Sequence, residues 1–183
     1  MRKSPDQYDK VSKAFHWIAA AIVVTAFVLG PGDFGRIVDD GVDPATRNDI
    51  VWHESLGVAV FVLTFLRLIW VALRPGAPRH QMSAWMFGLS RLAHFALWAL
   101  LLSLPISALL ALGSESHPLT LLGGMRINVF PFVGNSYFSN LADWGEIHKL
   151  LGDVIIWLAG IHALAAIYHH IRLKDKVLVS MLP

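Results

Sequence analysis

The chain has 183 residues, of which 55% are hydrophobic and only 15% are charged, and its mean hydropathy is +0.55. A soluble domain carries about 25% charged residues, so this composition argues against a water-soluble globule. Cysteine is absent, which excludes disulfides, iron–sulfur clusters, thiolate metal sites and haem attached through a CxxCH motif. The formal net charge of +2 is too small to indicate a nucleic-acid partner.

Four apolar segments follow one another along the chain, at about residues 14–29, 51–73, 92–112 and 147–171. About 20 apolar residues in a helix cross the hydrocarbon core of a bilayer, and each segment reaches or nearly reaches that length. The first segment lacks a small-residue cleavage site, so we interpret it as a membrane helix and not as a signal peptide. The sequence therefore predicts an all-α integral membrane four-helix bundle that forms a single domain over residues 1–183.

The second and third predicted helices each contain one unusual residue. Arg67 is an interior charge in the second helix, and Pro105 lies inside the third, where we expect a kink. The fourth helix carries Lys149 and Asp153 near its start. Because a charge inside a membrane helix is costly, Arg67 is a candidate functional residue.

The charges of the connecting segments predict how the helices cross the membrane. Basic residues gather in the N-terminal leader, the second connection and the C-terminal tail: Arg2, Lys3, Lys10, Lys13, Arg74, Arg79, Arg91, Arg172, Lys174 and Lys176. Acidic residues prevail in the first and third connections: Asp33, Asp39, Asp40, Asp43, Asp49, Glu115 and Asp143. Lysine and arginine mark the cytoplasmic side of a membrane protein. We therefore expect both termini to be cytoplasmic and the acidic connections to face outward.

Four of the nine histidines fall at two depths of the predicted bundle. His16 and His162 lie near the cytoplasmic face, whereas His53 and His148 lie near the outer face. His148 and His162 share one helix face, because 14 residues span close to four turns, or about 21 Å. Two imidazoles on facing helices can supply the axial ligands of a b-type haem, so the pattern predicts two haem b groups stacked across the membrane.

Other interpretations of these histidines stay open. Each could be a hydrogen-bonded histidine of the helix core, and zinc or copper also binds histidine pairs, although a closed zinc site needs further ligands. Arg67 follows His53 by 14 residues and so reaches the inner depth, where it could pair with haem propionates or extend to lipid headgroups. Gly57, Gly152 and Gly160 lie near the histidines, which suits either a flat macrocycle or close helix packing.

Several motifs resemble the bacterial cytochrome b561 type of four-helix di-haem proteins, which includes the superoxide oxidases. The segments that carry the resemblance are KAFHWIAA, VWHESLGV, FLRLIW followed by LRPGAP, RLAHFALW and IHKLLGDVIIWLAGIHALAAIYHHIRLKD. The similarity runs from about residue 10 to the end of the chain.

The resemblance implies a multi-pass protein of the bacterial inner membrane. His16 and His162 would ligate the cytoplasmic-side haem, and His53 and His148 the outer haem. It also implies ubiquinone binding at the cytoplasmic side and one-electron chemistry at the outer side, with superoxide as the donor in the superoxide oxidases. The leading hypothesis is thus a superoxide:ubiquinone oxidoreductase. The alternative is a cytochrome b relay subunit that links a partner dehydrogenase or hydrogenase to quinone, although such subunits are often longer.

The remaining polar residues supply candidates for the two substrate sites. His169 and His94 are candidates at the quinone site, since quinone reduction needs protons and histidine titrates in the relevant range; His169 could instead anchor the helix at the interface. Lys149 and Arg126 are the cations that could attract superoxide, unless they pair with Glu146, Asp143 or a propionate. The many outer acids count against an anionic substrate. We expect no site role for His80 or His117.

Overall fold

The computed structural model describes residues 7–32, 34–74, 76–78, 82–134 and 136–182. Its long helices are α1 (Lys10–Val28), α3 (Asn48–Leu73), α4 (Ala84–Ser114) and α6 (Trp144–Tyr168). A five-residue π-helical segment, His169–Leu173, extends α6. All four helices are long and apolar enough to cross a membrane. The predicted all-α four-helix membrane fold is confirmed. Of the residues named above, Arg2, Lys3, Asp33, Arg79 and His80 lie outside the described residues.

The helices begin earlier than the apolar segments, and in α1 and α6 an aspartate caps the added turn. The side chain of Asp9 accepts a hydrogen bond from the Ser12 backbone N–H at the start of α1. Asp143 caps α6 in the same way through the Glu146 backbone N–H. Capping satisfies N–H groups that have no partner inside the helix. The helix α4 starts eight residues before the predicted position and continues through Pro105 to Ser114.

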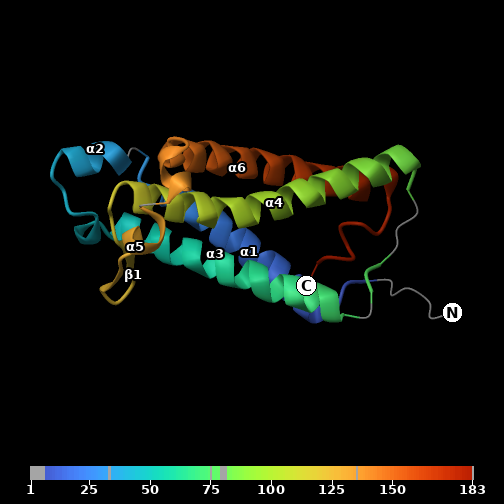
Figure 1. Cartoon of the computed structure of the whole chain (residues 1–183). Helices are drawn as coiled ribbons and strands as arrows, with labels where there is room; N and C mark the ends of the chain where they lie inside the picture. The colour runs from blue at the N-terminus through green and yellow to red at the C-terminus, as the bar shows by residue number, and fades with distance from the viewer. Residues whose placement is uncertain (1–6, 33, 75, 79–81, 135, 183) are drawn as a thin grey trace.

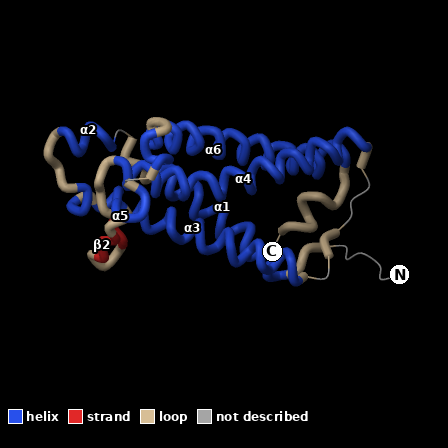
Figure 2. Tube along the Cα trace, viewed as in Figure 1, coloured by secondary structure: helices blue, strands red, loops and turns tan. Residues whose placement is uncertain are grey.

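The four helices form two pairs, α1 with α3 and α4 with α6 (Figure 1). Contacts between the pairs are fewer, mainly α3 with α4 and, to a lesser extent, α1 with α6. The pairs diverge toward the end of the bundle that carries both termini, and the C-terminal segment crosses there from α6 back toward α1 (Figures 1 and 2). Side chains from different pairs therefore face one another across the bundle.

The opposite end of the bundle is covered by short elements of the first and third connections (Figure 1). The first connection contains α2 (Phe34–Asp39) and η1 (Pro44–Thr46). The third contains two antiparallel strands and two short helices: β1 (Leu119–Leu121), β2 (Met125–Ile127), α5 (Phe130–Val133) and η2 (Tyr137–Asn140). A small hydrophobic core lies beneath them and is formed by buried Leu112, Leu119 and Val129 with Phe34, Val58, Leu109 and Leu121.

The strands β1 and β2 are an addition that apolar patterning did not predict. Leu119 pairs with Ile127 and Leu121 with Met125. Between the strands, Gly123 and Gly124 have φ angles of +86° and +80°, which side-chain-bearing residues rarely adopt. Glycine at these positions therefore permits the three-residue turn.

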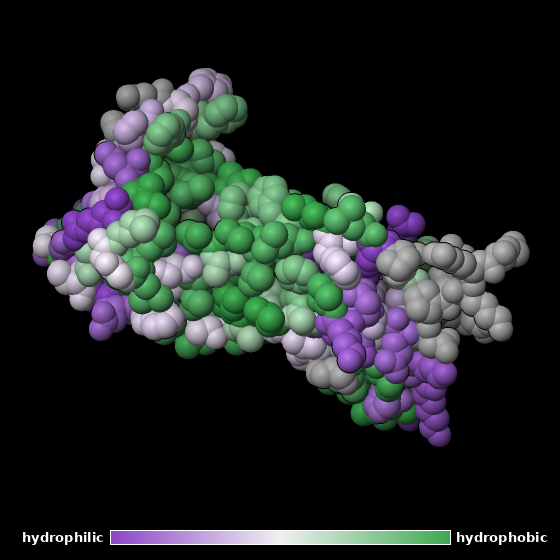
Figure 3. Space-filling model, turned by 90° about the horizontal axis from the view of Figure 1, so that it is seen from below, coloured by the Kyte–Doolittle hydropathy of each residue, from purple (hydrophilic) through white to green (hydrophobic). Residues whose placement is uncertain are grey.

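The surface of the bundle has a broad apolar belt between two polar ends (Figure 3). Large apolar side chains point away from the protein along the helices: Val28 is 73% exposed, Leu73 74%, Phe95 72% and Trp157 74%. Apolar surface on this scale is not stable in water but is the natural surface of a helix in lipid. The chain is therefore a multi-pass membrane protein.

Candidate functional site

His53 and His148, the pair predicted to lie near the outer face, face one another across the bundle, and we call them the outer histidines. The ring centroids of His53 on α3 and His148 on α6 are 5.9 Å apart, with an interplanar angle of 89°. The Nδ1 atom of His53 lies 2.7 Å from the carbonyl oxygen of Ala26, and that of His148 lies 3.0 Å from the carbonyl oxygen of Leu104. A carbonyl on Nδ1 leaves Nε2 as the nitrogen that can bind a metal, which is how metal-binding histidines are usually held.

The inner histidines form a similar pair. The ring centroids of His16 on α1 and His162 on α6 are 6.4 Å apart, with an interplanar angle of 69°. Two imidazoles that bind one metal ion through nitrogens about 2 Å from it have centroids about 6 Å apart. Both pairs have about this separation, so the residues fit a group whose metal takes two axial imidazoles.

Two glycines lie beside the paired histidines on open parts of the helix surface. Gly57 follows His53 by four residues and Gly152 follows His148 by four, so each shares a helix face with its histidine. A Cβ atom added at either glycine would meet no heavy atom within 4 Å, and the same is true of Gly160. Close helix packing would place atoms of a neighbouring helix there. Gly57 and Gly152, which are half-buried, therefore leave room for a flat group beside the histidines, whereas Gly160 is exposed on the helix surface.

Arg67 lies toward the inner pair. Its guanidinium carbon is 5.0 Å from the centroid of the ring of Trp98, which lies one helical turn after His94 on α4. Within the described part of the chain, Arg67 has no ion pair with a carboxylate. A guanidinium in that position can bind an anionic group at the inner end of the bundle.

His94 is a third imidazole at the inner end. Its ring centroid lies 5.1 Å from that of His162, and its Nδ1 atom lies 2.7 Å from the carbonyl oxygen of Ser90. His94 and His162 belong to the same helix pair, α4 and α6. The sequence assigned His94 to the inner end but gave no signal that it would lie beside His162.

His169 lies in the π-helical extension of α6, where its Nδ1 atom is 2.5 Å from Oδ2 of Asp175. Sequence reasoning missed Asp175, because a carboxylate six residues farther on reaches the histidine only where the helix ends and the chain turns. The neighbouring His170 is exposed. His169 is thus held by a carboxylate near the cytoplasmic end predicted for α6.

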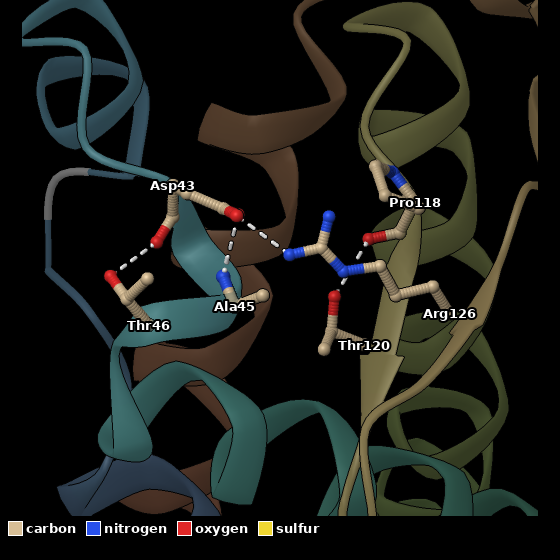
Figure 4. A network of polar contacts seen from close by, with 6 residues as sticks. All are labelled: Asp43, Ala45, Thr46, Pro118, Thr120 and Arg126. Atoms are coloured by element: carbon tan, nitrogen blue, oxygen red, sulfur yellow. Dashed lines mark hydrogen bonds and ion pairs between the residues drawn. The ribbon is translucent and has the colours of Figure 1, made fainter.

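Arg126 and Lys149, the two cations considered for attracting superoxide, are both paired with carboxylates. The Nη2 atom of Arg126 lies 2.6 Å from Oδ2 of Asp43, a partner that the sequence did not suggest (Figure 4). The Nζ atom of Lys149 lies 3.8 Å from Glu146, one of the partners that sequence reasoning considered. Much of the positive charge that could attract an anion is therefore compensated locally.

Glu54 is a second carboxylate that sequence reasoning missed. It follows His53 directly, and its Oε2 atom accepts a hydrogen bond from the Thr120 backbone N–H. The Ser55 hydroxyl accepts one from the Leu122 backbone N–H at 2.9 Å. These bonds attach the β1–β2 hairpin to the outer end of α3, next to His53. No signal in the local sequence could identify a partner about 66 residues away.

The described residues contain no group of three or more histidines and carboxylates that could hold a metal ion by themselves. The paired imidazoles thus suit a metal that brings its own equatorial ligands, as haem iron does. The protein-family model described as "Prokaryotic cytochrome b561" matches residues 7–183 of the chain.

The chain belongs to the prokaryotic cytochrome b561 family. It is 27% identical over 187 residues to "Cytochrome b561 homolog 2" of Escherichia coli (strain K12), covering 98% of this chain and 93% of that protein. It is 27% identical over 183 residues to "Probable superoxide oxidase CybB" of Yersinia pestis, covering 97% and 96%. It is also 32% identical over 138 residues to "Cytochrome b561 homolog 1" of Escherichia coli (strain K12), covering 72% and 73%.

Membership of the cytochrome b561 family supports three general statements about the chain. It is a multi-pass bacterial membrane protein, it functions in electron transfer, and its cofactor is haem of the b type. The two facing imidazole pairs are the side chains of this chain that fit such a cofactor.

Proposed function

We propose that this cytochrome b561 family member binds two haem b groups in the bacterial inner membrane and transfers electrons from superoxide at its outer face to ubiquinone at its cytoplasmic face. The two facing imidazole pairs, with centroids 5.9 Å and 6.4 Å apart, are the observation that carries this proposal. Their 14-residue separation on α6 corresponds to about 21 Å, which separates the two sites across the bilayer.

In this assignment His53 and His148 would hold the outer haem, and His16 and His162 would hold the inner one. Arg67 would bind a propionate of the inner haem, since its guanidinium has no carboxylate partner in the described residues. Bound haem b supplies reversible one-electron chemistry. The carbonyl oxygens of Ala26 and Leu104 hold the Nδ1 atoms of the outer imidazoles and so fix the orientation of Nε2.

The paired imidazoles also determine where substrates can react. If His53 with His148, and His16 with His162, each held a haem iron, the imidazoles would leave the metal no free position, and superoxide and ubiquinone would have to exchange electrons without binding it. At the cytoplasmic end, His169 and His94 are available to exchange protons with a quinone.

Superoxide as the outer donor is supported by the relative named as a probable superoxide oxidase, which the chain matches over 97% of its length. Arg126 and Lys149 are the outer cations that could attract the superoxide anion, although Asp43 and Glu146 compensate their charges. Superoxide would therefore be attracted by the local field of these ion pairs and not by a net positive charge of the outer face.

That compensation favours a second function. A relay subunit would accept electrons from a partner dehydrogenase or hydrogenase and pass them to quinone, and it would need no cation free to attract an anion. The outer elements α2, β1 and β2 would then contact a partner protein.

Stopped-flow absorbance of the purified holoprotein separates these functions. We expect two low-spin haem b per chain by the pyridine haemochrome assay, rapid haem reduction by superoxide, and reoxidation by a soluble ubiquinone without any partner. Haem that superoxide does not reduce, but that ubiquinol reduces, would favour the relay subunit. One haem per chain, or none, would contradict the pairing of the histidines.

A further inference from the structure

The pair formed by His169 and Asp175 has the arrangement of a proton-donating group and the residue that orients it. The Nδ1 atom of His169 lies 2.5 Å from Oδ2 of Asp175, and the two side chains are only 15% and 23% exposed. A carboxylate at Nδ1 fixes the ring orientation and keeps a proton on that nitrogen. It leaves Nε2 as the nitrogen that can meet a substrate.

Asp175 is itself held in place by the turn that follows the helix. Its Oδ1 atom accepts a hydrogen bond from the Val177 backbone N–H at 3.0 Å, and Lys174 before it adopts a left-handed conformation with φ of +52°. The carboxylate therefore has one oxygen for the turn and the other for His169. The position of Asp175 therefore depends on the folding of the C-terminal segment.

The C-terminal segment, residues 174–182, is also attached at its far end. The Trp17 Nε1–H donates to the Met181 carbonyl oxygen at 2.9 Å, and the Tyr8 backbone N–H donates to the Ser180 carbonyl oxygen at 3.1 Å. Trp17 directly follows His16, and their rings are 5.3 Å apart. The segment thus runs from the end of α6 to α1 at the end where the two helix pairs diverge (Figure 1).

We propose that Asp175 is a positioning residue that holds His169 as the proton donor to the quinone at the cytoplasmic end of the bundle. The inference rests on the proposed function, in which ubiquinone is reduced there. Conversion of one ubiquinone to ubiquinol takes two protons and the two electrons released when two superoxide ions become two O₂. In each proton transfer the Nε2–H bond of protonated His169 breaks, an O–H bond forms on the quinone, and cytoplasmic water returns a proton to the ring.

The test compares Asp175→Asn with the wild-type holoprotein in a soluble ubiquinone assay. Asparagine keeps an oxygen for the Val177 N–H and loses the charge opposite His169. We expect superoxide to reduce the haems of the variant at the wild-type rate when quinone is absent. The kcat of quinone-dependent reoxidation should fall about 10- to 100-fold, with the KM for quinone changed less than about two-fold. Asp175→Glu should restore part of the rate, because it restores the carboxylate.

Two further variants make the result specific. Lys176→Gln changes an exposed residue of the same segment and should react at the wild-type rate. His169→Gln should slow reoxidation, and Asp175→Asn added to it should cause no further loss, since the two residues act as a unit. A wild-type rate of reoxidation in Asp175→Asn would overturn the inference. If Asp175→Asn does not hold haem, a wild-type rate in His169→Gln would overturn it instead. Wild-type protein that ubiquinone does not reoxidise would instead refute the proposed function.

Discussion

The Ser107 hydroxyl lies 3.2 Å from Nδ1 of His148, at a position on α4 that is only 2% exposed. The same hydroxyl donates to the Leu104 carbonyl oxygen, which is also a partner of His148 Nδ1. Two groups of α4 therefore fix the orientation of one imidazole on α6. The contact links the packing of α4 against α6 to the geometry of the outer histidine pair.

Replacement of Ser107 by alanine should loosen the orientation of His148 without removing it. We expect Ser107→Ala to keep both haems but to lose haem from one site about ten-fold faster, because outer-shell partners of a ligand affect metal affinity on this scale. Transfer of haem to an excess of apomyoglobin measures the loss rate. Ser103→Ala is the matched control, since Ser103 donates to Ala99 in the same way on the exposed side of α4. Equal loss rates in the two variants would contradict a role for Ser107.

Single replacements of the paired histidines should remove one haem at a time. His53→Ala or His148→Ala should leave about one haem per chain at the inner site, and His16→Ala or His162→Ala should leave about one at the outer site, because each site needs both imidazoles. The pyridine haemochrome assay gives the ratio. His170→Ala, at an exposed position, should retain two. Loss of both haems in any single variant would show that the sites do not form independently.

Compensation of Arg126 by Asp43 has a measurable consequence for an anionic substrate. Asp43→Asn should leave the charge of Arg126 uncompensated and raise the rate of haem reduction by superoxide about two- to three-fold at low ionic strength, with the gain lost at high salt. Asp40→Asn is the control, because it removes the same charge from a carboxylate that pairs with Arg36. Equal rates in the two variants would show that Arg126 does not guide superoxide.

The Asp43–Arg126 pair also predicts how the outer end responds to acid. The hydrogen bond from Arg126 holds the pKa of Asp43 below its ordinary value. A lowered pKa in the folded state stabilises the fold above the ordinary pKa, and this contribution is lost as the pH falls through the lowered value. The pair is therefore intact at neutral pH. The protection factors of the β1–β2 hairpin amides, which correct for the slower intrinsic hydrogen exchange in acid, should fall on acidification in the wild type and change less in Arg126→Gln.

A polar cluster at the other end of the bundle should contribute to stability. At the end of α3, the Trp70 Nε1–H donates to Asp9 at 3.1 Å and Arg74 donates to the Ser12 hydroxyl at 3.1 Å. These hydrogen bonds connect the end of α3 to the start of α1. Trp70→Phe should lower the free energy of unfolding by about 1 kcal/mol, a Tm shift of about 2–4 °C in detergent. Trp157→Phe, at a 74% exposed position, should leave the Tm unchanged. Equal Tm values for all three proteins would show that the cluster contributes little.

The sequence alone predicted the four long helices and the depth of their polar residues. Apolar length identified the four helices, because about 20 residues must cross a bilayer. The 3.6-residue period placed His148 and His162 on one face of α6, and the ring distances of both predicted pairs agree with a shared depth. Helix starts were less accurate, since Asp9 and Asp143 cap turns that contain polar residues and lie outside the apolar segments.

Apart from the histidine pairs, contacts between residues far apart in the sequence were decided by the tertiary structure alone. Glu54 contacts Thr120, Arg126 contacts Asp43, and Trp17 contacts Met181 across 66, 83 and 164 positions of the chain. Such pairs depend on how loops and chain ends fold against the helices, and no repeat or period in the sequence encodes them. The thickness of the bilayer sets the length of a membrane helix, so that length can be recognised in the sequence. The distant polar contacts form only in the folded arrangement that brings each buried or interfacial polar group to a hydrogen-bond partner.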